Sequence, residues 1–127
     1  MKISVLFKSV IDSDIAPIVI CDLSHTIVYM NPTAVKRYEK RGGEKLIGSS
    51  LLDCHNGDSN EKIKKVIGWF EQSEDNNRIF TFHNAKEDRD VYMIALRDDD
   101  RRLIGYYEKH EYRQHETALP YEAEVSV

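Results

Sequence analysis

The segment from Ile18 to Asn31 restricts the fold of this chain more than any other part of its sequence. It contains two short, mainly apolar runs, 18–21 and 26–30, separated by a four-residue connection that ends at His25. Both runs are rich in β-branched residues, which favour strands, and a short connection between two such runs predicts a β-hairpin. We therefore expect an antiparallel sheet, with His25 as a turn residue.

The dipeptide Asn31-Pro32 predicts the start of a helix directly after the second strand. Asn is a preferred N-cap residue, and Pro suits the first helical turn. The expected helix covers residues 33–40 and ends at Arg41-Gly42-Gly43, after which the chain continues with Glu44-Lys45-Leu46-Ile47-Gly48.

Hydrophobic periodicity predicts the positions of the other elements. An amphipathic helix is expected over residues 1–14, and a second one over residues 60–73 with Ser59 as its N-cap. Strands joined by polar loops are expected at 78–83, 90–97 and 103–111. Two strands, several helices and a three-stranded meander predict an α+β fold with a five-stranded antiparallel sheet.

Short motifs occur along most of the chain in a definite order. They are Asp22, Ile27, Tyr29 and Asn31 in the hairpin, Glu44 and Leu46-Ile47-Gly48 after the first helix, and Val91-Tyr92-Met93, Leu96-Arg97-Asp98 and Leu103-Ile104-Gly105-Tyr106 in the last strands. Their order and spacing resemble a PAS domain, a small sensory module of signalling proteins. The segment 51–56 looks like a PAS subgroup found in bacterial proteins of unassigned role.

The resemblance covers residues 17–112, which we expect to form the core domain. It implies a sheet with strand order 2-1-5-4-3 and short helices packed on one face. Residues 1–16 would form an N-terminal helix that packs on the outer face of the sheet or on a second subunit. Residues 113–127 would form a flexible tail or the start of a linker.

Composition argues against several classes of function. The chain of 127 residues has a net charge of −4 with its basic residues interspersed among acidic ones, so we expect no binding of nucleic acid. No apolar run approaches the roughly 20 residues of a membrane span, so we expect no membrane contact. Because no secretion signal is evident, Cys21 and Cys54 are expected to be free thiols of a cytoplasmic protein. No catalytic motif occurs, so we expect no enzymatic activity.

The pair Cys54-His55 is the sharpest candidate site. Thiolate and imidazole can ligate haem iron or other metals, and the resemblance places this loop beside the PAS cavity. The structural interpretation is that Cys54 acts as a small buried hydrophobe and that His55 binds a backbone carbonyl in the turn.

The resemblance also argues against two cofactors. The helix at 60–73 contains no histidine, whereas oxygen-sensing haem PAS domains carry their proximal ligand there. The cysteine motif of flavin-binding PAS photosensors is missing as well. We therefore expect no cofactor and no metal, and the alternative is a haem-binding redox or gas sensor that uses Cys54 or His55.

The resemblance implies a sensory or interaction module of bacterial signal transduction. We expect it to bind a small ligand or a signalling partner protein and to relay the change through a homodimer contact. The candidate ligand-binding residues, chosen by position, are Ile20, Tyr29, Cys54, His55, Ile63, Ile67, Phe82, Ile94 and Tyr106. The alternative is a pure dimerisation domain whose core is filled by its own side chains. The histidines at 83, 110 and 115 are expected to be solvated.

Overall fold

The computed structural model describes residues 2–122 of the chain. Three α-helices and five strands follow one another in the order α1, β1, β2, α2, α3, β3, β4, β5. Their bounds are α1 Ile3–Asp12, β1 Val19–Asp22, β2 Ile27–Met30, α2 Pro32–Arg37, α3 Gly57–Gln72, β3 Arg78–Asn84, β4 Arg89–Arg97 and β5 Leu103–Tyr112. Between α2 and α3 lie three short 3₁₀ helices, η1 Glu39–Arg41, η2 Gly43–Leu46 and η3 Leu51–Cys54.

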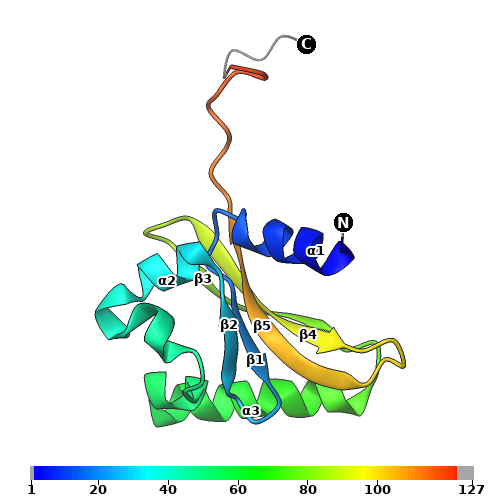
Figure 1. Ribbon diagram of the computed structural model, residues 1–127. Coiled ribbons are helices and arrows are strands. Elements are labelled where there is room, and N and C mark those ends of the chain that lie inside the picture. The colour runs from blue at the N-terminus through cyan, green and yellow to red at the C-terminus, as the bar shows by residue number, and fades with distance from the viewer. Residues whose placement is uncertain (1, 123–127) are drawn as a thin grey trace.

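The five strands form one antiparallel sheet in the order β2-β1-β5-β4-β3. This order confirms the α+β fold and the topology that the PAS resemblance implied. Helix α3 runs across one face of the sheet, and α2 lies beside the β2 end (Figure 1). We call the face covered by α3 the inner face.

The core lies between the inner face and α3. Hydrophobic side chains from both layers are buried there, and α3 contributes Ile63, Ile67 and Phe70. These residues recur at a spacing of three to four, which places them on one side of the helix. The sheet contributes Cys21, Ile27, Met30, Met93 and Tyr106.

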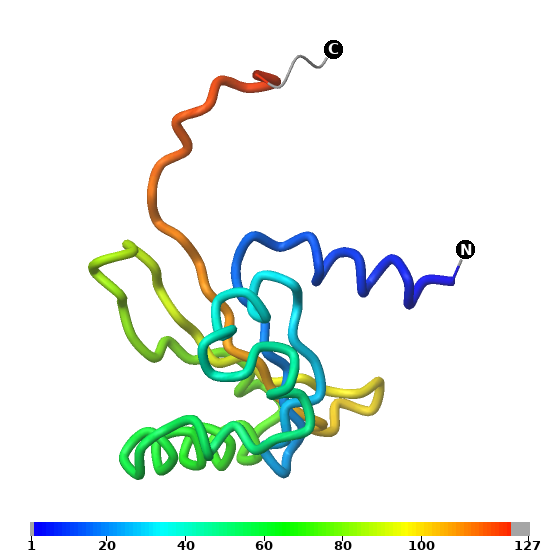
Figure 2. Tube along the Cα trace, turned by 60° about the vertical axis from the view of Figure 1, so that its left-hand side comes forward, coloured from blue at the N-terminus to red at the C-terminus, as the bar shows by residue number. Residues whose placement is uncertain are grey.

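The N-terminal helix packs less closely than the others. Helix α1 has no buried residue, although its sequence is amphipathic, and it projects from the body of the domain (Figure 2). Its C-terminal end is anchored by the Tyr29 hydroxyl, which donates to Asp12, and by the Asn31 amide, which donates to the Ile11 carbonyl at 3.0 Å.

The segment after β5 extends away from the domain (Figure 2). Residues 113–122 form neither helix nor strand, and residues 123–127 of the predicted tail lie outside the described residues. The division of the chain into residues 1–16, 17–112 and 113–127 stays a prediction.

Two helix boundaries differ from those predicted. Helix α3 begins at Gly57 rather than at residue 60, and its N-cap is Asn56, whose side-chain oxygen accepts from the Ser59 amide at 2.9 Å. Asn and Ser are about equally good N-caps, so residue preference alone does not choose between Asn56 and Ser59. Helix α2 ends at Arg37, and the chain tightens into η1 before reaching Gly42.

Gly105 of β5 is expected to tolerate no side chain. A Cβ at this position would lie 2.4 Å from the Cys21 carbonyl oxygen on the paired strand β1. Because that obstacle is backbone, the sheet would have to shift, and Gly105→Ala should lose about 1–3 kcal/mol of unfolding free energy.

Urea unfolding measures this loss, with Gly68→Ala as the matched control. Nothing lies within 4 Å of a Cβ built at Gly68, in the middle of α3. Alanine favours helix more than glycine, so this variant should gain about 0.5–1 kcal/mol. Equal stabilities of the two variants would contradict the prediction.

Candidate functional site

A cavity of about 100 Å³ lies between the inner face of the sheet and the helical segments. It is mostly apolar, with several polar side chains on its wall. The lining residues are Val19, Cys21, Ile27, Met30, Tyr38, Arg41, Leu46, Leu51, Cys54, His55, Ile63, Met93, Tyr106, Glu108 and His110. Because Arg41 and His55 are exposed, the cavity reaches the surface beside η1 and η3.

Side chains two residues apart along a strand point to the same face of the sheet, and this alternation places three polar residues of β5 at the cavity. Tyr106, Glu108 and His110 alternate with residues that point to the other face, so all three lie on the inner face. Cys21 pairs with Tyr106, and Met93 pairs with Glu108, so β1 and β4 present their own inward residues beside them.

Backbone hydrogen bonds fix the opposite wall. The segment after η2 pairs with the outer edge of β2: the Gly48 amide donates to the Ile27 carbonyl at 2.8 Å, and the Ile27 amide donates to the Ser49 carbonyl at 2.9 Å. Gly48 adopts a positive φ of 94°, a conformation that glycine accepts without strain. This pairing holds η3, and with it Cys54 and His55, against the cavity.

The structure supports the structural interpretation of His55. Its Nδ1 lies 2.9 Å from the Leu51 carbonyl oxygen. A carbonyl only accepts, so Nδ1 carries the proton and Nε2 of the neutral ring is left as an acceptor. Cys54 is half-buried rather than buried, and its carbonyl accepts from Arg41 Nη1 at 3.3 Å.

A polar cluster that includes the buried side chains of Arg89 and His110 adjoins the cavity at His110. Arg89 and His110 are 3% and 8% exposed, and the Arg89 guanidinium donates to His110 Nδ1. On its other side Arg89 Nε donates to Glu87 at 2.6 Å, and Glu87 also pairs with Arg37 at 3.1 Å. His110 Nε2 lies 3.3 Å from Glu108 Oε1.

The protonation of two cavity groups follows from their burial. Burial raises the pKa of the Cys21 thiol from its ordinary value to about 11, and it also raises the pKa of Tyr106. The Tyr106 hydroxyl lies 2.8 Å from Nδ1 of His25, the residue at the turn of the first hairpin. Both Cys21 and Tyr106 are therefore neutral at physiological pH.

Cys21 is expected to resist alkylation at neutral pH, whereas Cys54 reacts. The thiolate is the nucleophile, and Cys21 is protonated at neutral pH and only 1% exposed. Peptide mass spectrometry of the folded chain after timed iodoacetamide treatment measures both rates, and the same treatment in urea is the control in which Cys21 should become reactive. Equal rates at the two cysteines of the folded chain would refute this expectation.

Four of the nine residues proposed from the sequence line the cavity: Cys54, His55, Ile63 and Tyr106. Ile67 is buried in the adjoining core instead.

The other four lie elsewhere. Ile20 and Ile94 both pair with Tyr107, the neighbour of inward Tyr106, so they point to the outer face. Tyr29 pairs with Ile20 and bonds to α1. Phe82 lies on the edge strand β3 and is 48% exposed.

The prediction that His110 is solvated is wrong. His110 is buried and lines the cavity, as does Glu108, which sequence analysis also missed. The period of two from Tyr106 could have identified both residues. His83 and His115 are exposed, as predicted.

Haem and flavin do not fit the observed cavity. Its volume of about 100 Å³ is well below the about 300–1,000 Å³ typical of pockets for drug-sized ligands. Within residues 2–122, no group of three or more His, Cys, Asp or Glu side chains is placed to hold a metal ion. In that same part of the chain, no helix is long and apolar enough to cross a membrane.

Comparison with known proteins gives fold neighbours only. No protein-family model matches this chain, and no curated protein sequence matches it significantly. A PAS domain from Colwellia psychrerythraea shares 16% identity with a TM-score of 0.64, covering 87% of this chain and 97% of that one.

Two further solved structures are similar. A C-terminal domain from Streptococcus mutans shares 16% identity with a TM-score of 0.67, covering 88% of this chain and 85% of that one. A sensory box sensor histidine kinase from Vibrio cholerae shares 14% identity with a TM-score of 0.57, covering 86% and 90%. Together with the strand order, these likenesses show that the chain has the PAS fold.

Proposed function

We propose that this PAS-fold chain is a sensory module of a bacterial signalling pathway, which binds a small ligand in its cavity and relays the change to a second copy of itself. The observation that carries this proposal is the cavity, where polar side chains from η1, η3 and β5 converge on a mostly apolar space. Pockets with this character are typical ligand sites. The sensor histidine kinase among the fold neighbours supports a signalling role.

The proposed module has no catalytic activity and works in the cytoplasm. The two free thiols, Cys21 and Cys54, suit a reducing compartment. A signalling partner protein would receive the output.

A continuous set of contacts supports the proposed relay. Met30 lines the cavity, and the next residue, Asn31, donates to the Ile11 carbonyl near the end of α1. Tyr29 donates to Asp12, which also pairs with Lys8 at 2.6 Å. A ligand that shifts β2 would therefore act directly on α1. This requires that the ligand binds the chain with β2 shifted and the chain with β2 unshifted with different affinities.

The exposed apolar side of α1 supports the dimer contact. Four of the large hydrophobic residues of this helix, Ile3, Leu6, Phe7 and Val10, are at least half exposed and recur at a spacing of three to four, which places them on one side. Apolar side chains gathered on one exposed helix are a feature of interaction surfaces. The rival function, a dimerisation domain with a filled core, shares this surface but does not account for the cavity.

Ligand binding is tested by screening small metabolites against the ¹⁵N-labelled chain by NMR. The Cys54→Phe variant, which puts a ring into the cavity, should abolish binding. Val28→Phe is the matched control, because Val28 is exposed on β2 and does not line the cavity. A screen in which no compound shifts the cavity amides would favour the filled-core dimerisation domain.

Dimerisation is tested separately by sedimentation. Phe7→Asp on α1 should convert a dimer to a monomer, because a carboxylate cannot be buried unpaired in an apolar contact. Ile15→Asp is the control, since Ile15 is exposed but lies outside α1. A wild-type chain that sediments as a monomer would remove the dimer contact from the proposal.

A further inference from the structure

We propose that the cavity binds a small zwitterion, an amino-acid-like molecule whose ammonium group is held by Glu108 and whose carboxylate is held by Arg41. This inference rests on the proposed ligand-binding function and names the class of ligand. Both charged residues line the same cavity, Glu108 from β5 and Arg41 from η1.

The carboxylate of Glu108 is available because the neighbouring arginines are already paired. Arg37 and Arg89 both bind Glu87, at 3.1 and 2.6 Å. In the part of the chain that the structure describes, His110 is the only basic side chain within ion-pair distance of Glu108, at 3.3 Å.

The tautomer of His110 decides whether its Nε2 donates a hydrogen bond to Glu108. The guanidinium of Arg89 has donors only, so its contact with Nδ1 requires that nitrogen to be the acceptor. The single proton of the neutral ring is then on Nε2, which donates to Glu108. Arg89 thus acts as a positioning residue, and Glu108 keeps acceptor sites for a group that donates several hydrogen bonds.

An ammonium group suits these acceptor sites. It carries three donors and a positive charge, and a carboxylate has about four lone-pair sites, of which His110 uses one. The charge of Glu108 is felt inside the cavity, since after burial it is the next cause of the raised pKa of Tyr38, another lining residue.

Arg41 supplies the opposite charge. Its Nη1 donates to the Cys54 carbonyl at 3.3 Å, and no carboxylate within residues 2–122 pairs with it. A planar guanidinium can bind a carboxylate through two parallel hydrogen bonds. A ligand with one charge would bind only one of these two charged side chains, whereas a zwitterion binds both.

The volume limits the size of this ligand. The cavity volume of about 100 Å³ is several times smaller than the about 300–1,000 Å³ typical of pockets for drug-sized ligands. A compact molecule such as glycine or alanine suits this smaller volume, and a nucleotide or an aromatic cofactor is far larger.

The test is an NMR titration of the ¹⁵N-labelled full chain with glycine and alanine, compared with acetate and methylamine as ligands of one charge. The zwitterions should shift the amides around Glu108 and Arg41 with saturation, and more tightly than either single-charge compound. Glu108→Gln and Arg41→Gln should each weaken binding by about tenfold or more, the range for losing a hydrogen bond to a charged group.

Lys109→Gln is the matched control, because Lys109 is adjacent on β5 but does not line the cavity. It should bind the zwitterions like the wild type. The ring ¹⁵N shifts of His110 in the unmodified protein should show an unprotonated Nδ1, which tests the positioning role of Arg89 without any variant.

The outcomes separate this inference from the proposed function. The zwitterion inference is wrong if acetate or methylamine binds the cavity as tightly as glycine, or if the Glu108→Gln variant binds glycine as tightly as the wild type. In either case the proposed ligand-binding function is still supported. If no compound of the wider screen shifts the cavity amides, both proposals fail. A protonated Nδ1 on His110 would overturn the role assigned to Arg89.

Discussion

Replacing Asn31 with alanine is expected to lower the free energy of unfolding by about 3–5 kcal/mol, since several buried hydrogen-bonding groups lose their partner at once. Asn31 is fully buried, and its side chain uses both of its polar atoms. The oxygen accepts from the Ile18 and Ala34 amides, each at 2.9 Å. The nitrogen donates to the Ile11 and Ala16 carbonyls, each at 3.0 Å.

These four bonds join separate parts of the fold. They connect the end of α1, the entry to β1 and the first turn of α2 through one amide group. Asn31→Asp is informative for the same reason, because a carboxylate can keep the two accepted bonds but cannot donate to the carbonyls of Ile11 and Ala16. We expect it to be destabilised too, and to loosen α1 in particular.

Asn56→Ala is the matched control for Asn31→Ala. Asn56 is also an N-cap, but it is exposed and its side chain accepts one bond, from the Ser59 amide at 2.9 Å. Its loss should cost about 1 kcal/mol, the usual value for a cap. Urea unfolding measures both variants, and a similar cost at the two positions would show that Asn31 serves only as a cap.

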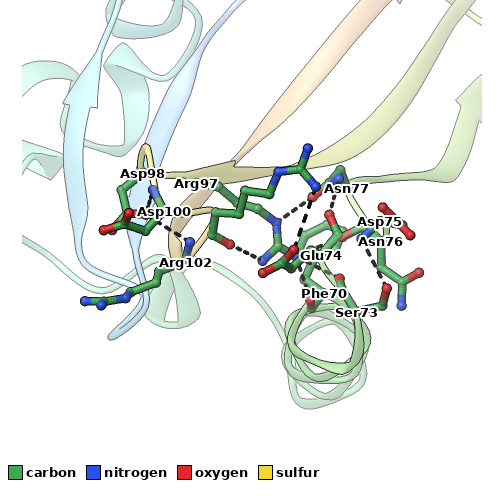
Figure 3. A network of polar contacts seen from close by, with 11 residues as sticks. Phe70, Ser73, Glu74, Asp75, Asn76, Asn77, Arg97, Asp98, Asp100 and Arg102 are labelled. Carbon is green, nitrogen blue, oxygen red and sulfur yellow. Dashed lines mark hydrogen bonds and ion pairs between the residues drawn. The ribbon is translucent and has the colours of Figure 1, made fainter.

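The second large effect is expected at Arg97. The substitution Arg97→Met should lower the free energy of unfolding by about 2–4 kcal/mol, because it leaves several carbonyl groups without a donor. Arg97 lies at the end of β4, and its guanidinium reaches the C-terminal end of α3 (Figure 3). Its Nη2 donates to the Phe70 carbonyl at 2.7 Å and to the Ser73 carbonyl at 3.0 Å. Its Nε donates to Asn77 at 2.6 Å, and its Nη1 to the Arg101 carbonyl at 3.1 Å.

The position of Arg97 at the C-terminal end of α3 explains why its replacement is expected to have a large effect on stability. The last carbonyls of a helix have no partner within the helix, and a cation there also interacts favourably with the helix dipole. Arg97 fills both roles for α3 while it ties the loop before β3 to the hairpin between β4 and β5. Its loss should therefore increase amide hydrogen exchange chiefly in residues 70–77.

Arg101→Met is the matched control for Arg97→Met. The Arg101 side chain is 70% exposed and lies 3.8 Å from Glu74. An exposed ion pair of this kind contributes little, so the change should stay within about 0.5 kcal/mol. Arg97→Lys should recover only part of the stability, since an ammonium group cannot reproduce the planar set of donors. Full recovery with lysine would mean that charge alone stabilises the end of α3.

The elements that follow from local chemistry agree with those predicted from the sequence. The hairpin at the start of the domain, the cap at Asn31 and the three strands of the meander follow from residue preferences and from periods of two and 3.6. The boundary of α3 was missed because Asn56 and Ser59 are both good caps, and the sequence does not say which one the helix uses.

The inner face of the sheet was harder to identify. Met93 and Ile94 are both apolar, as are Ile20 and Cys21, so alternation gives no indication of which residue faces the helices. In β2 a register shift opposite Ile20 and Cys21 also breaks the period of two, which moves Tyr29 away from the face of Ile27.

Most of the helices and strands could be predicted from the amino-acid sequence, because strand, helix and turn preferences act between residues that are close along the chain. The cavity could not be predicted in this way, because it is formed by tertiary contacts. Arg89 meets His110 across two paired strands, and Arg41 meets Cys54 across a loop, through contacts that depend on register and on the packing of distant segments. A shift of register by one residue would turn Glu108 and His110 to the outer face, so the chemistry of the site depends on the assembled sheet.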